Sequence, residues 1–460
     1  MKYLISFIFL CMNTIMYAQN TLPIIKLTGN FGYDYQEGTV SLIYPDNSSE
    51  NNLSAKIKWR GGSTNTEGKH KRNYKIKFSE NHSFFGLRND NNWILDAGQA
   101  DVFRLRNRIA TELWNDFASK PYYIDQEPNA LSGVRGQVVE VYLNEEYMGI
   151  YCFTECLDRK QMKLKKFDKD ETIHGCLWKS SDYGCSTMYQ VPDNYDNSQS
   201  MMDVFEAKYP EPGEDLPETD YSVLWNAINF VANSSDEEFT NQVADYFDIP
   251  AIIDYYLFIN ILNALDNVGK NMYWAVYDKQ KNNKITPAIW DLDLTIGSHA
   301  LEQYHSAFSS PYYNIGDGLN IITRLKSLNV DNFNQKVTQR YIELRKSYFS
   351  TNSLISRYKK YYDILKSSGT AQREQNRWSG DSDVFGEVID FDNEIKYISN
   401  WISDHMQYID DNYFDYKEAT SINNITYQNS DHAIYTLTGI KIKNPKKGIY
   451  IKNNRKIIIK

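Results

Sequence analysis

Apolar and polar residues alternate along much of the first half of the chain, which is typical of β-strands with one buried face. In RNYKIKF, at positions 72–78, Tyr74, Ile76 and Phe78 share one face and lysines occupy the other. Two alternating segments flank the polar residues 144–147 and predict a hairpin. The alternating segments interpreted as strands are Leu22–Leu27, Thr39–Tyr44, Leu53–Trp59, Arg72–Phe78, Val138–Leu143 and Gly149–Thr154.

The apolar period lengthens to that of an α-helix in the second half of the chain. One helix is expected earlier, at about Val102–Phe117, and one hairpin interrupts the later helices at Asn271–Trp290. The later helices are expected at about Val223–Val231, Glu237–Phe247, Ala251–Leu265, Ile321–Leu328, Phe333–Ser347, Leu354–Ser367 and Glu387–Tyr413.

This order of elements predicts an α+β fold with a β-rich first part and a mainly helical second part. Residues 182–218 are rich in Pro, Asp, Asn, Ser and Gly, which favours a boundary there. We therefore expect a β-rich lobe at 19–200 and a helical lobe at 201–415.

The two ends of the chain have the character of export sequences. Lys2, an apolar run at 3–16 and Ala18 before Gln19 predict a signal peptide at 1–18. Residues 416–460 end in short β-branched runs separated by turn residues, which predicts a small β-rich tail. A terminal hairpin that caps the main domain is one interpretation. The ending GIYIKNNRKIIIK also closely resembles the C-terminal sorting domains of Bacteroidetes proteins exported by type IX secretion.

Composition narrows the classes of protein to consider. The 460 residues are 42% hydrophobic and 24% charged, which excludes a disordered or fibrous chain. The net charge is −9, yet the last 22 residues carry eight basic and no acidic side chains. The remaining chain is therefore decidedly acidic, which argues against a nucleic-acid partner. After the signal peptide no stretch is apolar enough for a transmembrane segment.

Four cysteines remain after the signal peptide, at positions 152, 156, 176 and 185. An exported chain tolerates disulfides, and four cysteines allow three pairings. Their spacing matches no standard zinc pattern, so buried thiols or disulfides are the simpler interpretation.

The second hairpin has oxygen-bearing side chains at both of its ends. Asp266 and Asn271 precede its first strand, and Asp291 and Asp293 follow its second. A hairpin returns to its starting point, so these four side chains are expected at one mouth. Carboxylates gathered there repel one another unless a cation lies between them. Hard oxygen ligands without sulfur favour Mg²⁺, Mn²⁺ or Ca²⁺.

The same arrangement parallels a phosphoryl-transfer site. In such sites an Asp orients the acceptor hydroxyl, an Asn five residues later binds metal, and an Asp after a hairpin binds the bridging metal. A basic strand at 71–77 is a candidate for holding the nucleotide phosphates, and Glu155 is a candidate for pairing with its lysine. A glycine-rich loop with spaced glycines is missing, and only Arg60-Gly61-Gly62-Ser63 is available for that role.

As an ordered set, these residues resemble the CotH family of atypical secreted protein kinases. The resemblance runs from about Leu22 to Tyr413. Its carriers are Leu22-Pro23, Lys58 to Ser63, Lys71 to Phe78, Trp93-Ile94-Leu95, Asp101, Arg106-Asn107, Val141 to Asn144, Gly149-Ile150-Tyr151, Glu155, Asp266, Asn271 and Trp290-Asp291-Leu292-Asp293.

The resemblance implies a two-lobed, kinase-like fold that uses ATP and Mg²⁺ or Mn²⁺ to phosphorylate Ser or Thr of exported or surface proteins. It implies Asp266 as the catalytic aspartate and Asn271 as a metal ligand, with Asp291 the first candidate for the metal aspartate and Asp293 the second.

The resemblance also implies which residues hold the nucleotide. Lys71 is the first candidate for the phosphate lysine and Lys75 the second, with Glu155 as the partner glutamate. Arg60 and Ser63 are candidates for the phosphate loop, although Gly62 stands where the family often has Asn.

Two other classes of function remain open at this point. A surface binding or adhesion protein would keep the fold without catalysis. A calcium-stabilised carbohydrate-binding protein would use the oxygen cluster without a lysine partner. The strand lysines, taken alone, are also typical of a solvated strand face.

Overall fold

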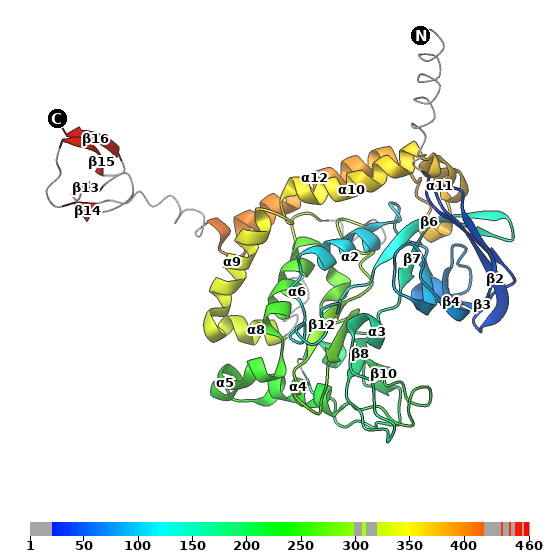
Figure 1. Cartoon of the computed structure of the whole chain (residues 1–460), viewed down its shortest axis with the longest axis horizontal. Coiled ribbons are helices and arrows are strands. Elements are labelled where there is room, and N and C mark those ends of the chain that lie inside the picture. The colour runs from blue at the N-terminus through cyan, green and yellow to red at the C-terminus, as the bar shows by residue number, and fades with distance from the viewer. Residues whose placement is uncertain are drawn as a thin grey trace, which may run out of the picture. The chain divides into compact units, whose positions relative to one another are not determined.

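The computed structural model describes residues 21–188, 190–298, 306–309, 320–417, 434–435, 441–442, 447–452 and 455–459. The chain divides into two units, Met1–Phe414 and Asp415–Lys460. The expected signal peptide at 1–18 lies outside the described residues. The first unit mixes strands and helices, so the expected α+β class agrees with it (Figure 1).

The first seven strands form a closed barrel rather than an open sheet. The strand order is β1-β2-β3-β4-β5-β7-β6, and a parallel pairing of β1 with β6 closes it. Closure leaves no free sheet edge on this part of the molecule. The strands are β1 (Ile24–Thr28), β2 (Gln36–Ile43), β3 (Ser49–Arg60), β4 (Asn73–His82), β5 (Asp90–Asp96), β6 (Gly136–Leu143) and β7 (Glu146–Glu155).

The alternation in the sequence explains which side chains fill the barrel. On β4, Tyr74, Ile76 and Phe78 are buried, while Lys77 is exposed. The predicted hairpin at 138–154 is present as β6 and β7. Its turn residues Asn144 and Glu145 both have positive φ, the conformation that a tight two-residue turn requires.

A second sheet lies beyond the barrel and has the order β12-β11-β8-β10-β9. The expected lobe boundary between residues 200 and 201 falls within the chain segment that builds this sheet. The predicted hairpin is present as β11 and β12. The bounds are β8 (Cys176–Ser180), β9 (Met201–Met202), β10 (Phe205–Tyr209), β11 (Met272–Val276) and β12 (Thr286–Ile289).

Most helices lie on the side of this second sheet away from the barrel, and α10 (Thr351–Ser367) and α12 (Phe391–Asn412) run from there toward the barrel (Figure 1). Helix α6 is buried along nearly its whole length, as its continuous apolar sequence requires. The bounds are α2 (Arg106–Phe117), α3 (Arg159–Met162), α4 (Ser222–Asn233), α5 (Asp236–Tyr246), α6 (Ile249–Ile261), α8 (Asn320–Ser327), α9 (Phe333–Arg345), α10 (Thr351–Ser367), α11 (Thr370–Trp378) and α12 (Phe391–Asn412).

Short 3₁₀-helices complete the first unit. They are η1 (Ser63–Asn65), η2 (Gly184–Thr187), η3 (Leu265–Asn267), η5 (Val330–Asn332) and η6 (Ser382–Val384). None of the helices in the described ranges combines the length and the apolar character that a bilayer crossing needs.

The second unit contains four short strands in the order β14-β13-β15-β16. Gly448–Lys452 (β15) and Arg455–Ile459 (β16) pair as an antiparallel hairpin, beside Ile434–Tyr435 (β13) and Lys441–Ile442 (β14). The β-rich tail expected from the sequence is therefore present, in the residues described there.

Candidate functional site

A cavity of about 410 Å³ lies where the barrel meets the second sheet. The barrel contributes the end of β3, the end of β5 and part of β7. The second sheet contributes Lys179 from β8 and the loops at the two ends of the β11–β12 hairpin. The charged residues in its lining are Arg60, Lys69, Asp96, Arg108, Lys179, Asp266, Lys270, Asp291 and Asp293.

The hairpin brings its two ends together, as its geometry predicts. Met272 pairs with Ile289, so Asn271 and the residue after β12 are neighbours across the sheet. Asn271 and Asp291 both have positive φ, at 52° and 59°. Non-glycine residues in this left-handed conformation concentrate at functional sites. The backbone is therefore turned at both ends of the hairpin, beside the cavity.

Asp266 is held by three neighbours. The side-chain amide of Asn271 donates to its Oδ2 over 2.6 Å, while Lys270 Nζ and the Tyr183 hydroxyl lie 3.0 and 3.1 Å from its Oδ1. Asn267 in turn donates to the backbone oxygen of Trp290 over 2.7 Å and ties this loop to the other hairpin end. Asp266 is therefore a fixed acceptor at the cavity wall.

Asp291 and Asp293 share the cavity with a further carboxylate, Asp96. The surrounding protein desolvates the carboxylate and raises the pKa of Asp291, although the residue stays exposed at the cavity; Asp96 raises it further. The pKa of Asp293 is raised by the same loss of solvation and then by Asp291. Carboxylates whose charged form is disfavoured in this way gain from a cation among them.

The loop after β3 forms another wall of the cavity. Arg60, Gly61, Gly62 and Thr64 line it, and the Arg60 guanidinium lies 5.4 Å from the centre of the Trp290 ring. Gly61 has φ +112°, which only glycine adopts readily. The side chain of Ser63 lies outside the described part of the chain.

Lys71 does not line the cavity but lies fully buried behind it. Its Nζ donates to the carbonyl of Ile150 over 2.6 Å and pairs with Glu374 Oε1 at 3.0 Å. Glu374 also accepts from Arg104 Nε over 2.7 Å. Burial lowers the pKa of Lys71 to about 7, although Glu374 acts in the opposite direction.

Lys75 and Glu155 also lie outside the cavity lining. Lys75 is half-buried on β4, opposite Lys58 on β3. Glu155 is fully buried and pairs with Arg135 Nη2 at 2.7 Å instead of with Lys71. Its Oε1 also accepts from the backbone amide of Arg88 over 2.8 Å. The ion pair expected between Lys71 and Glu155 is therefore absent, because each has another partner.

Five charged residues of the cavity were not among the sequence candidates: Lys69, Asp96, Arg108, Lys179 and Lys270. Asp96 ends β5 directly after the apolar residues Trp93–Leu95, and Asp291 likewise comes shortly after the apolar end of β12, so its position was a usable indication. Lys179 is flanked by Trp178 and Ser180 on a short buried strand. Burial lowers the pKa of Lys179, whereas the nearby Glu206 and Asp291 raise it. Nothing in the local sequence separates it from other strand lysines.

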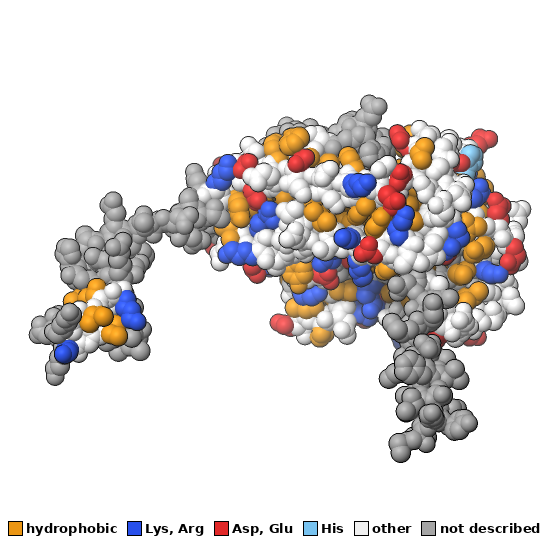
Figure 2. All heavy atoms as spheres, turned by 90° about the horizontal axis from the view of Figure 1, so that it is seen from above, with side chains coloured by type: hydrophobic (Ala, Val, Ile, Leu, Met, Phe, Trp, Pro, Cys, Tyr) orange, Lys and Arg blue, Asp and Glu red, His pale blue; other side chains and the backbone are white. Residues whose placement is uncertain are grey.

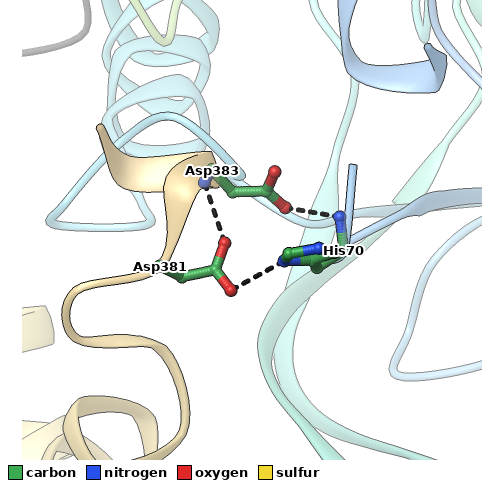
Figure 3. A group of neighbouring side chains, drawn as sticks. All are labelled: His70, Asp381 and Asp383. Carbon is green, nitrogen blue, oxygen red and sulfur yellow. Dashed lines mark hydrogen bonds and ion pairs between the residues drawn. The ribbon is translucent and has the colours of Figure 1, made fainter. Parts of the chain in front are cut away.

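A second cluster of possible metal ligands comprises His70, Asp381 and Asp383 (Figure 3). Lys69 and Phe385, close to these residues in the sequence, line the cavity. His70, Asp381 and Asp383 form the one group of three such residues, within the described ranges, whose ligand atoms all lie within 4.8 Å. Hydrogen bonds join them directly: His70 Nδ1 lies 2.8 Å from Asp381 Oδ2, and Asp383 Oδ2 accepts from the amides of His70 and Lys71. The cluster therefore ties the loop before β4 to the segment after α11.

The cysteines of the described part of the chain are free thiols at positions 152, 156 and 176. Cys152 is buried at the cavity wall, and burial raises its pKa to about 12. A neutral thiol is a poor nucleophile, so it has no part in the chemistry considered below. The side chain of Cys185 lies outside the described residues.

Acidic and basic side chains are interspersed on the face shown in Figure 2, with hydrophobic side chains between them. A basic face of the kind that nucleic acid binds is not seen there.

Comparison with known proteins completes the assignment. No curated protein matches this sequence. The family described as "CotH kinase protein" matches residues 57–409, which include the barrel from the end of β3 onward, the cavity residues and most of the helices. The matched region covers well over half of the sequence, and the chain therefore belongs to the CotH kinase family.

Proposed function

We propose that this protein is a metal-dependent protein kinase that transfers the γ-phosphate of ATP to Ser or Thr of exported or surface proteins. The observation that carries the proposal is the division of charge in one cavity. Asp96, Asp266, Asp291 and Asp293 share that cavity with Arg60, Lys179 and Lys270. A triphosphate with its divalent cation needs both kinds of charge at once.

The residues present fit a divalent cation. Asp291 and Asp293 have raised pKa values because their charges are poorly solvated and close to other carboxylates. Asn271 uses its amide nitrogen for Asp266, which leaves its amide oxygen for a cation. A set of carboxylate and amide oxygens without sulfur suits Mg²⁺ or Mn²⁺. A bound cation of this kind would neutralise charge on the phosphates.

Each residue has a defined task in this proposal. Asp266 accepts a hydrogen bond from the incoming hydroxyl and takes its proton during transfer. Lys270 and Asn271 hold Asp266 in place for that task. Asp291 is the first metal ligand, with Asp293 beside it. Arg60 and the backbone of the following loop contact the phosphates. Positioning and charge neutralisation account for most of the rate in phosphoryl transfer.

We also propose that the protein acts outside the cytoplasm. The sequence at 1–18 has the pattern of a signal peptide, and the tail resembles a type IX sorting domain. The basic character of that tail, separate from the acidic remainder of the chain, supports a function distinct from catalysis. Secreted or surface proteins with exposed Ser or Thr are then the substrate class.

The proposal is tested with purified protein, γ-labelled ATP and Mn²⁺ or Mg²⁺, followed by mapping of labelled residues. Transfer to Ser or Thr that disappears with chelator is the expected result. A thermal-shift measurement in parallel separates the alternatives: stabilisation that needs ATP and Mn²⁺ together supports the kinase. Stabilisation by Ca²⁺ alone, without transfer, would instead indicate a calcium-stabilised binding protein.

A further inference from the structure

We propose that Lys179 is the lysine that contacts the ATP phosphates and that Glu206 is its positioning residue. This inference rests on the proposed kinase function and deepens it. In this inference Lys179 and Glu206, from the second sheet, take the roles that the family resemblance implies for Lys71 and Glu155.

Lys179 belongs to β8, a central strand of the second sheet (Figure 1). Its direct cross-strand neighbours are Glu206 on β10 and Tyr273 on β11. Strand neighbours on one face of a sheet lie within reach of each other's side chains. The register therefore places a Lys–Glu pair one strand away from the hairpin that carries Asn271 and Asp291.

The pair with Glu206 orients Lys179 without fully engaging it. The Lys179 Nζ lies 4.0 Å from Glu206 Oε1, at the outer limit of an ion pair, and its side chain is 21% exposed. Glu206 Oε2 is bound by Lys208 instead. Lys179 lines the cavity together with Asp291, whereas Glu206 and Lys208 do not. The ammonium group is thus held at the cavity wall with hydrogens left for an anion.

The strand that carries Lys179 also anchors the metal-ligand loop. The backbone amide of Asn271 donates to the carbonyl of Ser180 over 3.0 Å, and the Ser180 hydroxyl donates to the carbonyl of Met272 over 3.1 Å. Lys179 on β8 and Asn271, directly before β11, are therefore held by two adjacent strands of one sheet. A phosphate-binding lysine must keep a constant distance from the metal site, and this arrangement provides it.

The other cations around the cavity, apart from Arg60, have polar partners of their own. Lys270 pairs with Asp266 at 3.0 Å, and Lys69 faces the carboxylate of Asp383 at 3.8 Å. Arg108 donates to the carbonyl of Val134 and pairs with Glu112. Arg60 stacks on Trp290 at the loop wall. Lys179 differs from these residues because its neighbouring carboxylate, Glu206, is shared with Lys208.

The test compares ATP and adenosine binding to the full protein in the presence of Mn²⁺. Lys179→Met should weaken ATP binding by roughly 10- to 100-fold, because a contact between a charged donor and phosphate is lost. Adenosine binding should stay unchanged, since adenosine has no phosphate. Lys77→Met, on an exposed position of β4, is the matched control, and Lys75→Met tests the candidate from the sequence.

Glu206 is tested by a pair of variants. Glu206→Gln should raise the KM for ATP several-fold while the thermal midpoint stays close to that of the wild type, and Glu206→Asp should restore most of the affinity. A purely structural role would lower the midpoint without this pattern of rescue.

The outcomes separate this inference from the proposed function. If the wild type binds ATP and Lys179→Met binds it equally well, Lys179 is not the phosphate lysine although the kinase assignment stands. A loss of ATP binding in Lys75→Met, with Lys179→Met unaffected, would overturn the inference in the same way. A wild type that binds neither ATP nor adenosine would contradict the proposed function itself.

Discussion

The side-chain amide of Asn271 donates a 2.6 Å hydrogen bond to the carboxylate of Asp266, five residues earlier in the chain. The bond joins the residue proposed to orient the acceptor hydroxyl to the residue proposed to bind metal. Asn271 makes this bond from a left-handed backbone conformation, which Asn and Asp adopt more readily than other side-chain-bearing residues. The identity of residue 271 therefore controls both the local backbone and the charge beside Asp266.

Asn271→Asp should make the stability of the protein depend more strongly on metal. The substitution keeps the volume and the backbone preference but places a second carboxylate against Asp266. Without metal we expect a loss of about 1–3 kcal/mol, since a hydrogen bond becomes a repulsion. Mn²⁺ should raise the thermal midpoint of Asn271→Asp more than that of the wild type, because charge at a site increases its affinity.

Asn271→Gly is the matched control for that measurement. It tolerates the backbone conformation and removes the amide without adding charge. Its response to Mn²⁺ should be smaller than that of the wild type. Equal midpoint shifts in all three proteins would mean that residue 271 lies outside any cation site.

The buried Lys71 should make stability increase with pH in the neutral to alkaline range. Its pKa in the folded protein is about 7, well below its usual value, so the unfolded chain binds more protons between pH 7 and about 10. The free energy of unfolding of the wild type, relative to Lys71→Met, should therefore rise with pH by at most about 1.4 kcal/mol per unit. Denaturant titrations at pH 7, 8, 9 and 10 measure this difference.

Lys77→Met is the control for the pH series, because Lys77 is exposed on the adjoining strand. Its profile should run parallel to that of the wild type. A Lys71→Met profile that also runs parallel would show that Lys71 keeps its ordinary titration in the fold, contrary to its burial against Glu374.

The two adjacent glycines of the loop after β3 should respond differently to alanine. A Cβ at Gly61 would lie 2.1 Å from Thr64 Oγ1, on a backbone with φ +112°, whereas a Cβ at Gly62 would meet nothing within 4 Å. Gly61→Ala should cost about 1–3 kcal/mol and weaken ATP binding by displacing the loop. Gly62→Ala should stay within about 0.5 kcal/mol of the wild type. Equal behaviour of the two variants would contradict the loop geometry.

Glu155 should affect stability and leave nucleotide binding unchanged. Its carboxylate is fully buried and is bound by Arg135 and by the amide of Arg88. Glu155→Gln should lower stability by about 1–3 kcal/mol, because charged hydrogen bonds are weakened in a dry environment. The KM for ATP should match that of the wild type. If Glu155→Gln raised the KM for ATP without changing stability, Glu155 would belong to the nucleotide site.

Local patterns predicted the elements whose packing follows from their own sequence. The β11–β12 hairpin follows from alternation and turn residues, and a hairpin necessarily places its two ends together. The proximity of Asp266 to Asn271 and the placement of Asp291 at the same cavity were therefore within reach of the sequence. Most of the helices were predicted for the same reason, since they have an apolar stripe or, in α6, a continuous apolar sequence.

Helix α11 was missed because its sequence, TAQREQNRW, is almost entirely polar. Contacts with the barrel and the loops beside it stabilise this helix. Glu374 accepts hydrogen bonds from Lys71 and Arg104, and Trp378 donates one to the carbonyl of Met148. Such contacts join positions about 300 residues apart for Lys71 and Glu374. No local period encodes them, so the partner of Lys71 was assigned to the nearer Glu155.

The sequence also could not show which lysine borders the cavity, for a related reason. Alternation shows which strand residues share a face, but it does not show which sheet borders the cavity. Lys75 and Lys179 are both half-buried on strands, and only the second belongs to the cavity lining. The closed barrel likewise depends on the parallel pairing of β1 with β6, which joins segments more than 100 residues apart.

The most direct test of the central claim is the effect of Asp266→Asn on phosphate transfer and ATP binding, measured on the same preparation. The substitution keeps the side-chain volume beside Lys270, Asn271 and Tyr183 but removes the acceptor for the hydroxyl proton. The account predicts that transfer from labelled ATP is abolished while the affinity for ATP with Mn²⁺ changes by less than about threefold. Transfer that persists at the wild-type rate in Asp266→Asn would contradict it.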